Sequence, residues 1–297
     1  VGIWAGPADS LLVFDVLIRR LTVIDRDAKL GRVFSLTGQG GQLVPSNGKV
    51  SVAIPLGWSA DGSVLALSQA FSINQNRSGI FRDTLTVLRY GPDGTARDTL
   101  GRFPGAETEQ MTLRLGAQSF SAPSAVPLGK VTASAVGRNR FFITKNDAWE
   151  LEVRGLDGKL QTLVRAHAVL ARITPSDMAA HRKEQLAALD ARPELRSMPE
   201  ALKKQLKAHV EQAKYPATLP FFGSLLVDAD GNLWAEQGSS PAQRSRRYDV
   251  VDSTGRWLGV VSMPADFRPT YVKADALYGV WTDPDKVEHV RGYRLRK

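Results

Sequence analysis

The 297-residue sequence predicts an all-β fold, a β-propeller, and two observations lead to that prediction. A tight Ala-Asp turn that runs into a short apolar strand recurs along the chain. Each copy is followed by further strands and turns in meander order, and four-stranded sheets repeated every ~40–50 residues are typical of propellers. A β-sandwich with regular hairpins is the structural alternative. The propeller is favoured because a sandwich does not require one phrase to recur.

The recurring phrase marks where each predicted sheet turns from its first strand to its second. Asp-Gly and Asn turns supply the positive φ that hairpins need, and β-branched, Leu and aromatic residues fill the strands that follow. The five copies begin at Ala8, Ala60, Gly137, Ala229 and Ala274, the third being degenerate. We therefore expect these five turns to occupy equivalent positions in five blades.

Two further strands joined by a second turn follow the first four copies. The predicted pairs are 20–25 with 31–36, 83–90 with 98–100, 149–154 with 160–164, and 247–251 with 257–261. The fifth copy stops one strand short, at 289–295. Five blades are therefore visible, and the stretches 39–57 and 106–129 are candidates for strands that the pattern does not reveal.

Residues 175–215 interrupt the β pattern with a helical hairpin inserted into a single propeller domain, residues 1–297. Thr174-Pro175-Ser176-Asp177 is typical of a helix start, and Ser197 to Glu200 reads as a second capping box. Met198, Leu202, Leu206 and Val210 then form one apolar stripe. We expect helices over 176–190 and 198–213 outside the ring, with the stripe packed on the propeller or on a partner protein.

Composition excludes several classes of protein. The chain has no cysteine, which rules out disulfide scaffolds, Cys-zinc sites and thiol catalysis. No apolar run is long enough for a transmembrane helix. The net charge of +9 is spread through both halves of the chain, so specific nucleic-acid binding is not predicted. The chain begins at Val1 without Met, which suggests a processed product with any targeting segment upstream.

The residues do not nominate a catalytic, cofactor or metal site. The four histidines, His167, His181, His209 and His289, have no metal-ligand spacing. Asp228-x-Asp230-Gly231 resembles the start of a calcium loop but lacks the distal Glu, so we interpret it as a hairpin turn. No phosphate-binding loop or nucleophile elbow occurs. We predict no cofactor.

Several segments resemble bacterial NHL-like six-bladed propellers. The run Asp15-x4-Arg20-Leu21-Thr22-Val23-Ile24-Asp25 is similar to the repeat phrase of that group. Three later segments, 226–235, 248–259 and 280–290, resemble its late blades. The resemblance implies a six-bladed ring in an exported, extracytoplasmic protein, although only five blades are visible here. Some members are lactonases, lyases or hydrolases, but none of their site residues can be matched to this chain.

The first functional hypothesis is therefore a non-enzymatic, extracytoplasmic scaffold that binds another protein, for example as an accessory subunit docked on the outer face of a membrane complex. An anionic surface is a second possible partner. The alternatives are a hydrolase or lyase centred on the channel and a module that binds glycans or anionic polymers. The predicted partner-binding residues are Met198, Leu202, Leu206, Lys203 and Lys207 in the insertion and the cluster Arg244, Arg246 and Arg247.

Overall fold

The computed structural model describes residues 2–38, 49–72 and 77–296, and within them the chain forms five antiparallel sheets. The first contains β1 (Gly2–Ala5), β2 (Leu11–Asp15), β3 (Arg20–Ile24) and β4 (Leu30–Phe34), and the second β5 (Lys49–Trp58), β6 (Val64–Ser72), β7 (Phe81–Tyr90), β8 (Ala96–Leu115) and β9 (Gln118–Ala125). The third contains β10 (Ala133–Val136), β11 (Arg140–Thr144), β12 (Glu150–Gly155) and β13 (Leu160–Arg165). The fourth contains β14 (Phe222–Val227), β15 (Leu233–Gln237), β16 (Ser245–Val251) and β17 (Trp257–Pro264), and the last β18 (Phe267–Lys273), β19 (Ala276–Thr282) and β20 (Glu288–Arg294).

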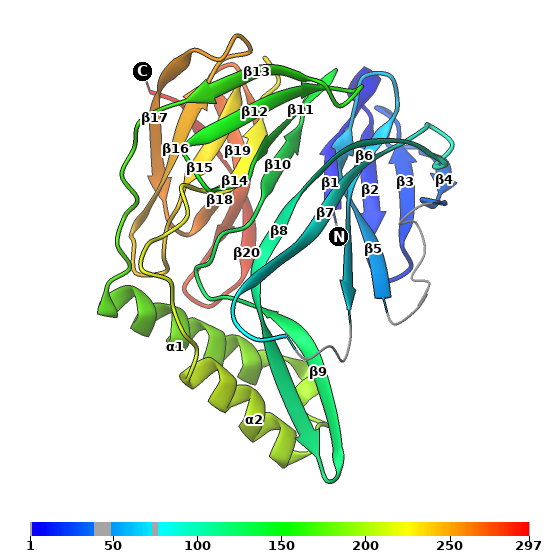
Figure 1. Ribbon diagram of the computed structural model, residues 1–297. Coiled ribbons are helices and arrows are strands. Elements are labelled where there is room, and N and C mark those ends of the chain that lie inside the picture. Colours follow the sequence, from blue (N-terminus) through cyan, green and yellow to red (C-terminus); the bar gives the residue numbers. More distant parts are fainter. Residues whose placement is uncertain (1, 39–48, 73–76, 297) are drawn as a thin grey trace.

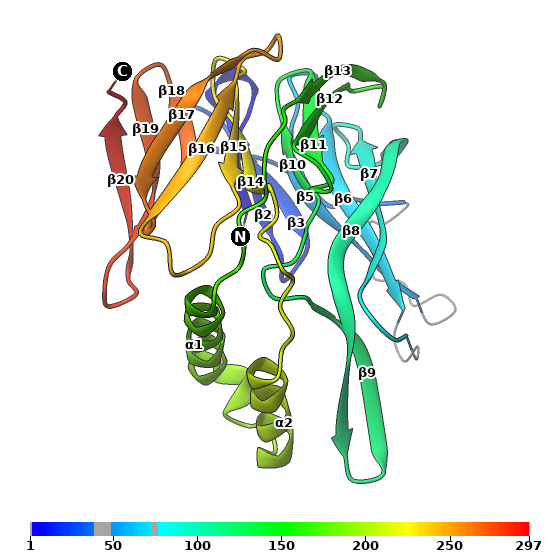
Figure 2. The ribbon, with the colours of Figure 1, turned by 60° about the vertical axis from the view of Figure 1, so that its left-hand side comes forward.

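These sheets are the blades of a β-propeller, which confirms the predicted fold class. The first strands of successive blades contact one another in the order β1, β5, β10, β14, β18. Each is therefore the inner strand of its blade, and the meander of each sheet runs outward from it (Figures 1 and 2). The described residues contain five blades.

Within the described residues the hydrophobic core forms four layers, each between two neighbouring blades. Leu12 and Phe14 of the first blade pack with Val64 of the second, whereas the adjacent residue Leu65 packs with Phe141 of the third. Phe142 turns the other way and packs with Leu233 of the fourth blade, which meets the fifth at Phe267. Both faces of the middle blades are thus buried, and each fully buried Leu or Phe contributes roughly 1.5–3 kcal/mol.

The five predicted turns are equivalent, as the repeat required. The turns at 8, 60, 137, 229 and 274 all join the first strand of a blade to the second. Gly62 and Gly231 supply the left-handed backbone in two of them, with φ of 78° and 89°, and Ala8 and Ala274 adopt the same region in two others. The Asp228 turn is a hairpin turn, since it joins β14 to β15 and the Asp228 carboxylate accepts hydrogen bonds from the Asp230 and Asn232 amides.

The helical insertion is confirmed as α1 (Pro175–Ala191) and α2 (Glu200–Glu211), joined by a short 3-10 helix, η2 (Pro193–Leu195). Thr174 and Asp177 form the predicted capping box of α1. The second predicted capping box is wrong, since Pro199 is the N-cap of α2 and no side chain caps that helix. The helices lie outside the ring, beyond one end of the blades (Figure 1).

Strands also occur in the two stretches left open by the sequence. Residues 49–57 belong to β5, whereas 39–48 lie outside the described residues. Residues 106–129 contain the end of β8 and all of β9, which pair from Thr108 with Ala125 to Leu115 with Gln118. This hairpin projects past the ring toward α2 (Figure 2). Its two-residue turn begins at Gly116, whose φ of 59° suits the tight reversal.

A candidate docking groove in the helical arm

The helical arm, residues 175–211, is attached to the propeller by a two-stranded stalk. The chain entering α1 and the chain leaving α2 run side by side: the Ile173 amide donates to the Ala217 carbonyl at 3.0 Å and the Leu219 amide to the Ala171 carbonyl at 2.8 Å. His181 of α1 contacts the Tyr215 hydroxyl through Nδ1 at 3.1 Å, and burial lowers the pKa of this imidazole. The stalk therefore fixes where α1 begins.

The far end of the arm rests on the β8–β9 hairpin. The Gln205 side chain accepts from the Arg114 amide and donates to the Arg114 carbonyl, both at 2.8 Å, so it pairs with β8 as another strand would. One turn later, His209 Nε2 lies 3.0 Å from the Ser124 hydroxyl. These contacts hold one face of α2, and they leave the face that includes Lys203, Lys204 and Lys207 directed toward α1 or solvent.

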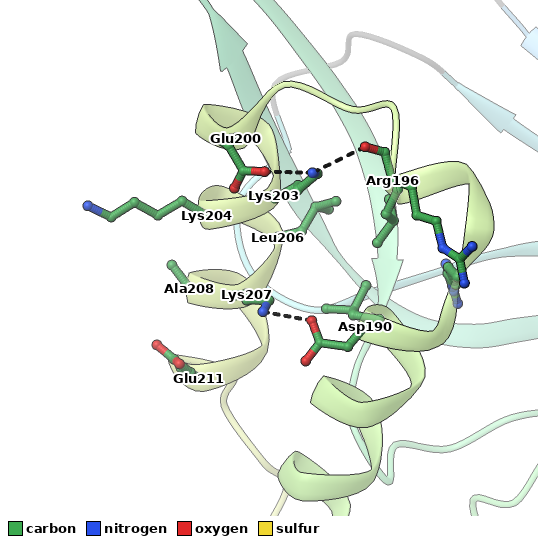
Figure 3. A pocket seen from close by; sticks show the side chains of 12 residues that line it. Asp190, Arg196, Glu200, Lys203, Lys204, Leu206, Lys207, Ala208 and Glu211 are labelled. Atoms are coloured by element: carbon green, nitrogen blue, oxygen red, sulfur yellow. Dashed lines mark hydrogen bonds and ion pairs between the residues drawn. The ribbon is translucent and has the colours of Figure 1, made fainter.

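A groove of about 520 Å³ lies between the end of α1, η2 and α2 (Figure 3). Its apolar lining comes from Leu189, Leu195, Leu206 and Ala208. Its charged lining comes from Asp190, Arg192, Arg196, Glu200, Lys203, Lys204, Lys207 and Glu211. Five of these side chains are basic and three are acidic, so the charged part of the lining has a net positive charge.

Two of the five cations hold the groove together. Lys207 Nζ lies 2.7 Å from Asp190 Oδ1, which connects α2 to α1, and this hydrogen bond raises the pKa of the Lys207 ammonium. Lys203 bonds Glu200 at 2.6 Å and the Arg196 carbonyl at 3.4 Å. Arg192, Arg196 and Lys204 are exposed and have no side-chain partner within the described part of the chain. These three are the cations available to a ligand.

The structure brings together only part of the predicted partner-binding set. Lys203, Leu206 and Lys207 line the groove, whereas Met198 and Leu202 are half-buried beside it and are not part of its lining. Residues that the sequence did not single out complete it, mainly Arg192, Leu195 and Arg196. The Arg-x3-Arg spacing across η2 was the available signal, but its meaning depends on α2 folding back beside it.

The cluster Arg244, Arg246 and Arg247 lies elsewhere, at the start of β16. Arg246 is committed to the fold, since it pairs with the buried Glu236 at 2.7 Å and donates to the Ala265 carbonyl at 2.9 Å. Arg244 and Arg247 are exposed. The loop before β16 contacts the N-terminal end of α1 through Ser240 and Asp177. The groove lies at the other end of α1. Along this helix, Asp190 in the groove is about 20 Å from Asp177.

The four histidines are dispersed. His181 and His209 are in the arm contacts already described, His167 is exposed, and His289 lies 3.0 Å from Asp283 on the fifth blade. The described residues contain no group of three or more His, Cys, Asp or Glu side chains that could hold a metal ion. Nor does any helix in that part of the chain have the length and apolarity to cross a bilayer.

Comparisons with known proteins give structural likeness at low sequence identity. No family model matches the chain, and no curated protein does. Among solved structures, a member of the DUF4221 family from Bacteroides vulgatus is 10% identical, with 97% of this chain and 77% of that chain covered and a TM-score of 0.42. A streptogramin B lyase is 12% identical, with 100% and 83% covered and a TM-score of 0.32. A virginiamycin B lyase from Staphylococcus aureus is 10% identical, with 99% and 83% covered and a TM-score of 0.34.

Proposed function

We propose that this protein is a non-enzymatic binding propeller whose helical arm docks an acidic segment of another protein, with an apolar side chain of that segment in the groove. The observation that supports this proposal is the groove itself, whose lining combines three leucines with three cations that have no side-chain partner in the described part of the chain. An extracytoplasmic location, with the partner a subunit of a membrane complex, is part of the same proposal.

The chemistry of the lining favours an acidic, amphipathic ligand. A carboxylate near Arg192 or Arg196 would gain a charge-assisted hydrogen bond without displacing an existing ion pair, because neither guanidinium has an ion-pair partner in the described part of the chain. Lys203 and Lys207, by contrast, already pair with Glu200 and Asp190. An apolar side chain against Leu189, Leu195 and Leu206 would remove surface from water at ~25 cal/mol per Å². Both features together match a helix-in-groove mode of recognition.

The arm also has the mechanical properties of a docking element. It is held at both ends, by the stalk at Ile173 and Ala217 and by the Gln205 contacts with β8. A groove that is already formed does not have to be ordered when the ligand binds, which reduces the entropic cost of association. The propeller then serves as the rigid platform that presents the arm.

Binding of two synthetic helical peptides tests the proposal. The first carries Leu at every third or fourth position and Glu on its remaining face, and the second has Lys in place of every Glu. We expect the acidic peptide to bind and the basic one not to bind. Arg196→Glu should weaken the acidic peptide about tenfold, which corresponds to ~1.4 kcal/mol. Lys183→Glu is the matched control, because Lys183 is exposed on α1 and does not line the groove.

A second pair of variants separates groove binding from general attraction to anions. Leu206→Asp should abolish the salt-resistant part of binding, whereas Val169→Asp, at a position that is 92% exposed before the arm, should leave it unchanged. Equal weakening by Arg196→Glu and Lys183→Glu, or attachment to anionic vesicles that is indifferent to Leu206→Asp, would contradict the proposal.

A further inference from the structure

In the part of the chain that the structure describes, β20 is the edge strand of the fifth blade. Its sheet there has three strands, whereas the other four sheets have four or five, and among the described residues β20 pairs only with β19. All seven of its residues are exposed, and its register with β19 runs from Glu288 to Arg294 without a bulge. Proteins commonly protect such edges with proline, bulges, very short strands or charged side chains. β20 has no proline and no bulge, and the charged side chains that it carries are Glu288, Arg291 and Arg294.

The backbone hydrogen bonds show which groups the open edge presents. The Leu295 amide donates to the Asp275 carbonyl at 2.8 Å, and the Asp283 amide donates to the Val287 carbonyl at 3.0 Å. In an antiparallel ladder, bonded residues alternate with residues whose amide and carbonyl point the other way. The odd-numbered residues of β20 therefore bond to β19. Glu288, Val290, Gly292 and Arg294 direct their backbone groups to the free edge.

We infer that two copies of this chain pair through β20, antiparallel and about a two-fold axis at Arg291. Arg291 is the middle residue of the strand, so this register pairs the whole of β20 with its counterpart. It also places residues with free backbone groups opposite one another, as hydrogen bonding requires. The two three-stranded sheets then form one continuous sheet of six strands.

The side chains of β20 suit this register. Glu288 lies opposite Arg294 of the second copy, and Arg294 opposite Glu288, so two oppositely charged cross-strand pairs form. Such pairs stabilise antiparallel sheets by roughly 0.2–1 kcal/mol each. In the monomer the two residues are six positions apart on one strand, roughly 20 Å, and are too distant to pair with each other. Glu288 approaches Arg268 only to 4.0 Å within its own blade.

Apolar residues on the same face add to the contact. Val290 is 84% exposed, and in this register it lies opposite Gly292 of the second copy. The Tyr278 ring covers Gly292 so closely that a methyl group added there would come within 3.1 Å of it. Val290 of one protomer therefore meets the exposed Tyr278 ring of its partner, and burial of both removes apolar surface from water.

One pair opposes dimerisation. Arg291 faces its own counterpart across the axis, and like charges directly opposite one another destabilise a sheet. This side chain is on the opposite face, where its guanidinium lies 3.3 Å from the centre of the Trp281 ring. Because the Arg291 guanidinium is held over the face of the Trp281 ring, the repulsion between the two Arg291 side chains is reduced. The dimer is accordingly of moderate affinity and depends on protein concentration.

Sedimentation equilibrium of the purified chain up to ~100 μM, together with charge-swapped variants, tests the inference. Glu288→Arg should weaken dimerisation about tenfold, because it creates two Arg–Arg pairs. The double variant Glu288→Arg, Arg294→Glu should restore it, since the pairs then form with reversed sign. Val290→Pro should abolish it without removing a bond to β19, because the Val290 amide points to the free edge. A chain that is monomeric throughout this range, or a dimer unaffected by Val290→Pro, would overturn the inference.

The register itself is open to a covalent test, because the chain has no cysteine. Opposed residues in a non-hydrogen-bonded pair have Cα atoms about 4.5 Å apart, within the range of a disulfide. With oxidised glutathione added as the oxidant, the single variant Arg291→Cys should form a disulfide-linked dimer, the glutathione disulfide being reduced to two thiols. His289→Cys, on the same face but off the axis, should not. Equal cross-linking at both positions would exclude the two-fold register at Arg291.

Discussion

Asp177, the third residue of α1, accepts a very short hydrogen bond from the Ser240 hydroxyl in the loop between β15 and β16. The same carboxylate caps α1 by accepting from the Thr174 amide at 2.8 Å. The Ser240 bond, followed by those from Thr174, lowers the pKa of Asp177, so the group is a carboxylate at neutral pH. One side chain thus starts the helix and joins the arm to the fourth blade.

Replacing Asp177 should therefore loosen the arm but leave the propeller folded. Asp177→Ala removes an N-terminal capping contact and the bond to Ser240, which together are worth roughly 2 kcal/mol. Hydrogen exchange should become faster in residues 175–211 and stay slow in β11 and β15. Glu184→Ala, at an exposed site on the same helix, is the control. Faster exchange throughout the chain would mean that the arm is part of the core.

A second side chain joins two blades. Asn146 is 1% exposed. Its side-chain oxygen accepts from the Phe222 backbone amide, and its side-chain nitrogen donates to the Phe222 carbonyl, both at 2.9 Å. Its φ of 63° is in the left-handed region, which Asn tolerates better than most residues. Asn146→Ala leaves both backbone groups of Phe222 without these partners, so we expect the free energy of unfolding to fall by about 3 kcal/mol. Urea denaturation measures it, and Asn139→Ala, in an exposed turn, should change it little.

The sequence predicted the blades well where local chemistry determines structure. Asp residues mark the turns because each carboxylate binds nearby amides, as Asp25 does with Asp27 and Lys29 at 2.9 Å. Runs of adjacent apolar residues, such as Phe141-Phe142-Ile143 in β11, locate the second strands because both faces of a middle blade are buried. The start of α1 was predictable for the same reason, since its cap is a neighbour in sequence.

The features that the sequence did not reveal depend on distant contacts. The β8–β9 hairpin projects beyond the ring, so its strands lack the apolar runs that burial on both faces of a blade favours. The groove exists only because η2 and α2 fold back along α1, which places Arg192 and Arg196 beside Leu206. Arg246 resembled its neighbours Arg244 and Arg247 in sequence, and only the position of Glu236 on the adjacent strand distinguishes it.

The turn at Asp61 should make stability depend on acid pH. Partial burial raises the pKa of Asp61, but hydrogen bonds from Ser59 and Ser63 and the charge of Arg89 outweigh it, so that the pKa is about 2. A carboxyl whose pKa is lower in the folded state contributes stability that is fully present above its unfolded value, near 3.8, and is lost as pH falls toward 2. We expect a contribution of about 1 kcal/mol at most, because the side chain is 41% exposed and solvent screens the ion pair.

Thermal unfolding of Asp61→Asn at several pH values measures this contribution. The variant should unfold at a lower temperature than the unmodified chain at pH 6, and the difference should shrink between pH 4 and pH 2. Asp27→Asn is the control, since the Asp27 side chain is 63% exposed in a comparable turn. A difference that is constant across this pH range would show that the carboxylate charge is not the stabilising feature.

The last prediction separates structure from binding among the three arginines before β16. Arg246→Ala leaves the Glu236 carboxylate, which is only 7% exposed, without its ion-pair partner, although Ser224 still donates to it at 2.7 Å. Breaking a buried pair from one side is costly, and the partial exposure of Arg246 moderates the cost to about 2–3 kcal/mol. The adjacent Arg247→Ala removes an equal charge from an exposed position and should change the free energy of unfolding by less than ~0.5 kcal/mol. If the two variants were equally stable in urea, the Glu236–Arg246 pair would contribute nothing to the fold, and Arg246 would return to the set of side chains free to meet a partner.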